Sequence, residues 1–155
     1  MNNENQRLLA LAIEISARAH KNQFDKGGKP YILHPLHLMT QLLFDVELAI
    51  IAVLHDVIED SAGAYTIESL QYLGFTDRVL RALELLTHNK GDDYLGVYIV
   101  NITKNYDAIR VKRKDLAHNS DITRLVGIRE KDLARIAKYH QAYLMLEAAK
   151  LRFIR

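Results

Sequence analysis

The chain has 155 residues, of which 49% are hydrophobic and 26% charged, and these values are ordinary for a globular protein of one domain. Its formal net charge of +2 is too small to indicate binding to a nucleic acid polymer, and the absence of cysteine excludes disulfides and thiolate metal sites. The longest apolar run, residues 48–54, is far below membrane-spanning length. We therefore expect a cytoplasmic protein that forms a single domain over residues 1–155 and does not enter a membrane.

Apolar residues recur at helical spacing along most of the chain, and no stretch alternates in the manner of a strand. Pro35 suits a first helical turn, Thr76 is a good N-terminal cap, and Gly74 is typical of a helix end. Taken in chain order, the pattern predicts helices at approximately residues 8–20, 35–44, 48–59, 67–73, 76–86, 92–104, 107–125 and 130–153. The expected fold is an all-α bundle of about seven to eight helices.

The segment from His55 to Asp60 places four ionisable side chains at the end of the most apolar predicted helix. His55 and Asp56 are adjacent, and Glu59 and Asp60 follow them by four residues, so each would share a helical face with its partner. A solvated acidic turn is the alternative interpretation. Carboxylates at a helix C-terminus, however, face the negative end of the helix dipole. We therefore expect a cation near these side chains.

Two further positions complete a candidate metal site. His34 precedes Pro35 at a predicted helix start, although a capping or partly buried histidine would be the ordinary interpretation of His34 alone. Asp115 and Asn119 are one turn apart on a helix with an apolar flank, where an inward carboxylate requires a partner charge or a metal. An ordinary polar helix face is the alternative. Two histidines with two aspartates favour Mn²⁺, Zn²⁺ or Fe²⁺ over Ca²⁺ or Mg²⁺, and such an ion activates water for hydrolysis.

These motifs resemble those of a known family. His34-Pro35, the segment His55-Asp56-Val57-Ile58-Glu59-Asp60, and the segment from Val111 to Asn119 are similar to the HD-domain hydrolases of the alarmone (p)ppGpp. The similarity is greatest to the hydrolase half of the RelA/SpoT enzymes and to their small stand-alone relatives. It includes residues 19–33 and extends over roughly residues 8–150, which is most of the chain.

The resemblance implies hydrolysis of the 3′-pyrophosphate of the alarmone, giving GDP or GTP and pyrophosphate. It implies that Glu59 and Asp60 activate or position the attacking water, that Asn119 lies near the nucleotide, and that Lys26 belongs to the loop that closes over it. Lys112 could in addition neutralise a substrate phosphate, although basic surface residues usually have no such role. The resemblance also implies one Mn²⁺ ion with four protein ligands, which are His34, His55, Asp56 and Asp115.

The chain departs from the family pattern in the loop before the first motif. The family usually has an Arg-Lys pair whose arginine lies against the guanine base, whereas this chain has Asp25-Lys26. An acidic residue removes that contact and is expected to repel phosphate. Three functions therefore stay open, namely hydrolysis of (p)ppGpp, hydrolysis of a different nucleotide or nucleoside phosphate, and nucleotide binding without catalysis. The apolar stripe of the last helix allows either a monomer or a homodimer.

Overall fold

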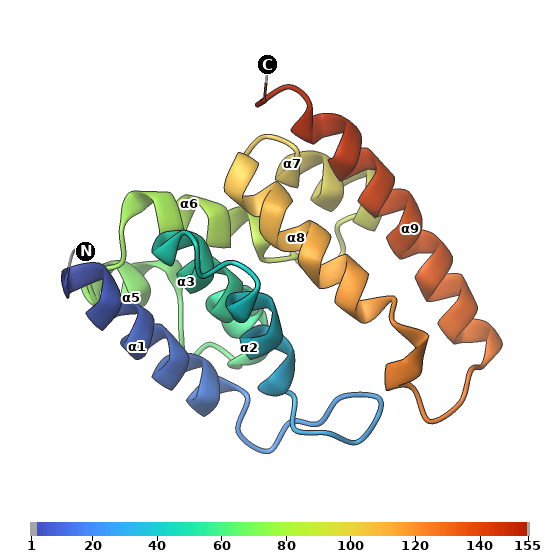
Figure 1. Cartoon of the computed structure of the whole chain (residues 1–155), viewed down its shortest axis with the longest axis horizontal. Coiled ribbons are helices and arrows are strands. Elements are labelled where there is room, and N and C mark those ends of the chain that lie inside the picture. The colour runs from blue at the N-terminus through green and yellow to red at the C-terminus, as the bar shows by residue number, and fades with distance from the viewer. Residues whose placement is uncertain (1–2, 155) are drawn as a thin grey trace.

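The computed structural model describes residues 3–154, and its regular elements are helical (Figure 1). Within those residues the one strand-like pairing is an isolated bridge between Phe24 and Pro30, and no helix has the length and apolar character needed to cross a membrane. The all-α prediction is confirmed. The α-helices are α1 (Asn3–Ala19), α2 (Leu33–Thr40), α3 (Val46–Leu54), α4 (Val57–Asp60), α5 (Ile67–Tyr72), α6 (Asp77–Leu86), α7 (Val100–Ile102), α8 (Tyr106–Asn119) and α9 (Glu130–Lys150), with a π-helix η1 (Tyr94–Ile99) and a 3₁₀ helix η2 (Ile122–Arg124).

Helix α3 forms the centre of the fold, because every residue from Leu48 to Leu54 is buried. It contacts α1, α2, α6 and α8, which explains why the helix has no polar face. Asp45 caps its N-terminus by accepting a hydrogen bond from the Leu48 backbone N–H at 3.2 Å. A helix enclosed on all sides holds the residue that follows it in a defined place, and that residue is His55.

Arg78 of α6 joins the N-terminal ends of three helices. Its guanidinium donates to Asp45 before α3 at 2.6 Å, to Glu47 in α3 at 3.0 Å and to Asp107 in α8 at 2.8 Å. Negative charge is also favoured at these helix N-termini by the helix dipole. The cluster therefore fixes α3, α6 and α8 relative to one another.

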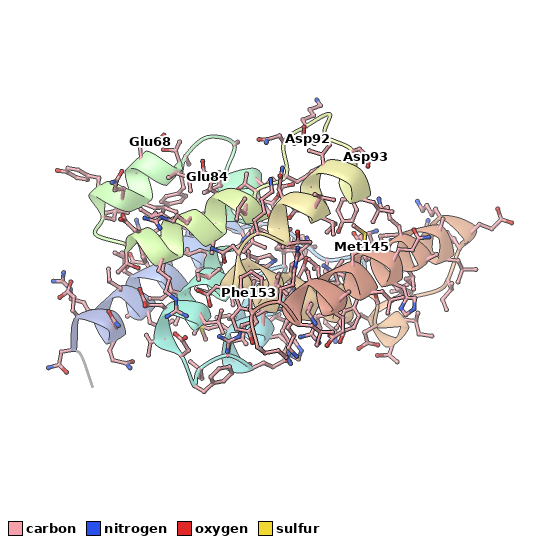
Figure 2. The ribbon with its side chains drawn as sticks, turned by 90° about the horizontal axis from the view of Figure 1, so that it is seen from above. Glu68, Glu84, Asp92, Asp93, Met145 and Phe153 are labelled. Atoms are coloured by element: carbon pink, nitrogen blue, oxygen red, sulfur yellow. The ribbon has the colours of Figure 1, made fainter. Side chains whose placement is uncertain are left out.

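The C-terminal part of the chain covers the side of the bundle formed by α8. Helix α9 lies along α8 in Figure 1, and Arg113 of α8 donates to Tyr143 Oη of α9 at 3.1 Å. Figure 2 shows the arrangement from above, with Met145 on α9 and with Glu68 and Glu84 on the neighbouring helices α5 and α6. Since α8 contacts both α3 and α9, it can contribute side chains to the core and to the surface under α9.

The predicted helix over residues 48–59 is interrupted in the structure. Helix α3 ends at Leu54, and α4 begins at Val57 after a turn made by His55 and Asp56. Asp56 has φ −102° and ψ −4°, so the backbone leaves regular α geometry at this residue. The expectation of one continuous helix is therefore wrong, although the Asp60 N–H bonds to the Asp56 carbonyl at 2.9 Å and keeps these two residues one turn apart.

Two other predicted helices differ at their boundaries. The helix expected over residues 107–125 ends at Asn119, because the Ser120 backbone N–H bonds to the carbonyls of Leu116 and Ala117 and closes the last turn. The helix expected over residues 92–104 begins as the π-helix η1, in which the Tyr98 N–H reaches the Asp93 carbonyl at 3.0 Å. Apolar spacing alone does not reveal either change, since both depend on local backbone bonding.

Truncation of a side chain in α3 tests its central place in the fold. Ile51 is fully buried, so Ile51→Ala is expected to lower the free energy of unfolding by about 2–5 kcal/mol. Leu144→Ala in α9 is the matched control, because Leu144 is 54% exposed and its truncation should change stability by about 0.5 kcal/mol or less. Chemical denaturation measures both variants, and equal losses would contradict this assignment of the core.

Candidate functional site

The four side chains predicted as metal ligands come from three parts of the fold. His34 lies in the first turn of α2, His55 and Asp56 form the turn between α3 and α4, and Asp115 lies in α8. His34 Nε2 is 3.0 Å from Asp115 Oδ1 and 4.0 Å from Asp56 Oδ2. His55 Nε2 is 2.9 Å from Asp56 Oδ2 and 3.7 Å from Asp115 Oδ1. The structure therefore groups His34, His55 and Asp115, and it places Asp56 beside the two histidines.

These distances fit a shared divalent metal ion. Nitrogen and oxygen ligands lie about 2.0–2.2 Å from a metal such as Zn²⁺, so two ligand atoms are no more than roughly 4.4 Å apart. All four distances given above satisfy this limit. The donor atoms of His34, His55 and Asp115 also lie within 4.8 Å of one another, while Asp56 approaches the two histidines.

The two histidines have an unusual feature that supports the same conclusion. The Nε2 atoms of His34 and His55 are buried and have no hydrogen-bond partner, although carboxylate oxygens lie 3.0 Å and 2.9 Å away. Buried polar atoms are nearly always satisfied in native proteins. A divalent cation would accept both nitrogen lone pairs and balance the two carboxylates. The residues present therefore suit a divalent metal.

Both carboxylates of the candidate metal site are held in the ionised form. Burial would raise the pKa of Asp115, but the ammonium of Lys112, whose Nζ is 2.7 Å from Asp115 Oδ2, holds that pKa well below its ordinary value. Burial likewise opposes ionisation of Asp56, but the charge of His55 lowers its pKa. Burial also lowers the pKa of His55, and the carboxylates of Asp56 and Asp115 outweigh that effect and raise it to about 10. Metal binding would displace this proton.

A hydrogen bond fixes the orientation of each candidate ligand histidine. His55 Nδ1 lies 2.8 Å from the Ala52 carbonyl oxygen and donates to it, which leaves Nε2 free for a metal. His34 Nδ1 lies 2.6 Å from His118 Nδ1. Burial lowers the pKa of His118 to about 4, so its neutral ring can accept the proton of His34. Sequence reasoning gave His118 no role, although its position three residues after Asp115 places both on one side of α8.

The contact between His118 and His34 leads to a test of metal affinity. His118→Ala removes the acceptor that orients His34 and is expected to weaken metal binding about 10–100-fold. His37→Ala is the matched control, because the centroid of the His37 ring lies 4.1 Å from that of His118, while His37 Nε2 lies 2.8 Å from Gln41 Nε2 of the same helical segment. Competition with a metal-sensitive chelator measures both affinities. Equal affinity in His118→Ala and the parent protein would show that His118 does not position His34.

Glu59 and Asp60 lie in a cleft beside the candidate metal ligands. Glu59 Oε2 accepts a hydrogen bond from the His88 backbone N–H at 3.1 Å, and Asp60 Oδ2 is 3.7 Å from His20 Nδ1. Partial burial and then the charge of Asp56 raise the pKa of both carboxyls, which makes them better proton acceptors. The cleft has a volume of about 290 Å³, and its walls include Tyr31, Asp56, Glu59, Asp60, Lys112 and Asn119.

A second cavity of about 290 Å³ adjoins this cleft and shares Tyr31, Asn119 and Tyr139 with it. Lys26 lines the second cavity, so two of the three predicted substrate-binding residues, Lys26 and Asn119, reach it. The third, Lys112, lies in the first cleft with its ammonium against a candidate metal ligand. The structure therefore provides one place for a reacting phosphate and a neighbouring place for the rest of a ligand.

Several residues of the two cavities were missed by sequence reasoning. Tyr31 Oη donates a hydrogen bond to Asp56 Oδ2, and the ring of Tyr98 lies 5.1 Å from Lys112 Nζ. The position of Tyr31 three residues before His34 was a usable signal, since tyrosine pairs readily with a buried carboxylate. Tyr139 of α9 gave no such signal, because its place at the cavity depends on how α9 packs on α8.

Comparison with known proteins finds similar sequences, although no model of a protein family matches the chain. Over 136 residues the chain is 31% identical to a guanosine-3′,5′-bis(diphosphate) 3′-pyrophosphohydrolase of Haemophilus influenzae, and the match covers 80% of this chain and 20% of that protein. Over 141 residues it is 27% identical to a protein of the same name from Borreliella burgdorferi, with 82% and 20% covered. The chain thus spans about one fifth of the length of these curated relatives.

The fold has a counterpart among solved structures. The chain matches a structure described as a metazoan ortholog of SpoT that hydrolyses ppGpp, with a TM-score of 0.67, 20% sequence identity, and 94% of each chain covered. At this level of identity the likeness concerns the fold. Together with the sequence matches it confirms the resemblance seen in the motifs. The chain is therefore an all-α bundle that shares its fold with this structure and resembles, over most of its length, the guanosine-3′,5′-bis(diphosphate) 3′-pyrophosphohydrolases.

Proposed function

We propose that the chain is a metal-dependent phosphohydrolase that removes the 3′-pyrophosphate from (p)ppGpp. The observation that carries this proposal is the convergence of two buried, unpartnered histidine nitrogens with two ionised carboxylates, beside a cleft that holds two more carboxylates. The relatives that are named as pyrophosphohydrolases support the choice of substrate.

Four side chains would hold the metal, and their mixture of imidazole and carboxylate donors supports Mn²⁺ as the ion. When bound, the metal would lower the pKa of water and offset negative charge on the phosphoryl group. The buried Lys112 ammonium keeps Asp115 ionised and in place. The four proposed ligands are His34, His55, Asp56 and Asp115.

The remaining residues of the cleft supply proton transfer and substrate binding. Glu59 and Asp60 would orient the attacking water and accept its proton. The water oxygen bonds to the phosphorus that is attached to the ribose 3′ oxygen. The bond between this phosphorus and the 3′ oxygen breaks, and the 3′ oxygen takes up a proton, so that ppGpp gives GDP and pyrophosphate. Lys26 and Asn119 would hold the nucleotide in the adjoining cavity, whose aromatic walls suit a nucleoside.

A substrate panel tests this proposal. The purified protein is incubated with Mn²⁺ and with ppGpp, pppGpp, a deoxynucleoside triphosphate, NADPH or a nucleoside monophosphate, and the products are separated by anion-exchange chromatography. Release of pyrophosphate from ppGpp and pppGpp is the expected result. The absence of the family's arginine at position 25 favours one alternative, the hydrolysis of a different nucleotide, and selective turnover of another nucleotide would establish it. Tight binding of ppGpp without turnover would instead show a non-catalytic module.

Four further properties are expected from the sequence. They are a cytoplasmic location, one domain over residues 1–155, a monomeric or homodimeric state, and no binding to nucleic acid polymers or membranes. Light scattering coupled to size-exclusion chromatography measures the oligomeric state directly. Because α9 carries exposed apolar residues such as Leu133 and Leu144, a dimer formed through this helix is one of the two expected outcomes.

A further inference from the structure

The loop between α1 and α2 contacts the turn after α8, as the path of the chain in Figure 1 shows. Asp25 Oδ2 of the loop pairs with Arg124 Nη2 at 3.2 Å, although the two residues are 99 positions apart. The side chains are only 13% and 20% exposed. A Cβ atom on Gly27 would lie 2.4 Å from the Arg124 backbone oxygen, so the loop backbone also touches this turn. Residues of the two segments line one side of the second cavity.

Asp25 also organises its own loop. Its Oδ1 accepts hydrogen bonds from the backbone N–H groups of Gly27 and Lys29, both at 2.9 Å. Burial would raise the pKa of Asp25, but the bonds from Lys29, Arg124 and Gly27 lower it, so the carboxyl is ionised. Its charge is balanced by Arg124 rather than directed freely at the cavity. The repulsion of phosphate expected from an acidic residue at this position is therefore largely cancelled within the protein.

Arg124 bonds at the same time to the end of α8. Its Nη1 donates to the His118 carbonyl oxygen at 2.8 Å and reaches Asn119 Oδ1 at 3.5 Å. Asn119 Nδ2 in turn donates to Asp115 Oδ1 at 2.6 Å. The bond to Asn119 is long, so the bond to the carbonyl is the one that fixes this turn. A continuous series of contacts thus connects the loop with a candidate metal ligand.

We propose that Arg124 is a positioning residue for the cleft and the second cavity. Through its pair with Asp25 it holds the loop at residues 23–30. Through its bonds to the end of α8 it keeps the Asn119 amide directed at Asp115. The planar guanidinium is suited to this task, because its fixed fork of donors can serve a carboxylate and a carbonyl together. Since the pair is mostly excluded from water, the loss of one partner leaves the other charge uncompensated. The effect expected on catalysis rests on the proposed function, whereas the effect on the loop does not.

Amide hydrogen exchange of Gly27 and Lys29 and the KM for ppGpp test this proposal. Asp25→Asn keeps the Oδ1 acceptor for the loop and removes only the charge, so exchange at both amides should quicken about 5–30-fold. KM should rise by a similar factor with kcat little changed, because Lys26 is no longer held at the cavity. Arg124→Gln should raise amide exchange and KM in the same way and should also weaken metal binding. Arg124→Lys keeps the charge but not the fork of donors, so its amide exchange and KM should lie between those of the parent protein and Arg124→Gln.

Combined variants separate the pair from each partner alone. If Asp25 and Arg124 act together, the variant Asp25→Asn/Arg124→Gln raises KM and amide exchange no further than Arg124→Gln alone. Gly27→Ala forces the two backbones apart without changing any charge, and it should reproduce the faster exchange. Arg18→Gln is the matched control, because Arg18 is 71% exposed and pairs with Glu14 on α1, and no quantity should change.

Two results would overturn the inference. One is unchanged exchange at Gly27 and Lys29 in both Asp25→Asn and Arg124→Gln, and the other is fully additive effects in the double variant. Exchange that quickens as expected in a protein that does not hydrolyse ppGpp would support the held loop and contradict the proposed substrate. The two proposals therefore fail in distinguishable ways.

Discussion

Asp115→Asn is expected to reduce kcat/KM for ppGpp about 10³-fold or more, which corresponds to about 4 kcal/mol of transition-state stabilisation. The carboxylate lies 3.0 Å from His34 Nε2 and 2.7 Å from Lys112 Nζ, so it contributes a ligand atom and balances a buried ammonium. Asparagine is neutral, so it is a weaker metal ligand and cannot balance the Lys112 ammonium. Metal analysis after dialysis should show the loss of about one divalent ion per chain.

A second variant separates this effect from a failure to fold. Because Asp115→Asn leaves the charge of Lys112 without its partner, it is also expected to lower stability. His55→Gln removes a different candidate ligand and leaves that ion pair intact, and it should abolish activity with a smaller loss of stability. Asp77→Asn is the matched control, since Asp77 is 75% exposed in α6. Metal content and turnover that persist in both Asp115→Asn and His55→Gln would refute the metal site.

Glu59→Gln is expected to lower kcat about 10²–10⁴-fold while leaving metal affinity unchanged. The amide can still accept the hydrogen bond from the His88 N–H, so the shape of the cleft is kept. It cannot accept a proton from water. Stopped-time assays at saturating ppGpp measure kcat, and a chelator competition measures metal affinity in the same preparations.

The dependence of kcat on pH gives a sharper signature of Glu59. Partial burial raises the pKa of Glu59 above the ordinary glutamate value of 4.5. Activity of the parent protein should therefore fall as pH decreases through this raised pKa, because protonated Glu59 cannot act as a base. The acid limb should change in Glu59→Gln, which leaves Asp60 as the remaining carboxylate, and stay unchanged in Glu84→Gln, whose side chain is exposed on α6. An identical acid limb in parent and Glu59→Gln would assign the proton transfer to another group.

The signals that led to the candidate metal site are local in the sequence. Histidine and aspartate at the end of an apolar run, and an aspartate on a helix with an apolar flank, are unfavourable arrangements unless a cation is near. The structure brings His34, His55 and Asp115 together and places Asp56 beside the two histidines. The helical class followed in the same way from apolar spacing, which needs no knowledge of tertiary contacts.

The features that the sequence did not reveal depend on contacts between distant segments or on backbone bonding. The turn at His55 and Asp56 interrupts an apolar pattern that continues through Val57. Likewise the helix predicted through residue 125 ends at Asn119 although apolar residues continue after it. The pairing of Asp25 with Arg124 joins positions 99 apart, so local reasoning assigned Asp25 a free charge that it does not have.

The most direct test of the account follows the fate of ppGpp in one assay. The protein is incubated with ppGpp as purified, after removal of metal with a chelator, and after addition of Mn²⁺, and GDP and pyrophosphate are quantified in each sample. The account predicts GDP and pyrophosphate in equal amounts, their loss on metal removal, and their return with Mn²⁺. Failure to release pyrophosphate with any divalent metal, or release that continues after the metal is removed, would contradict it.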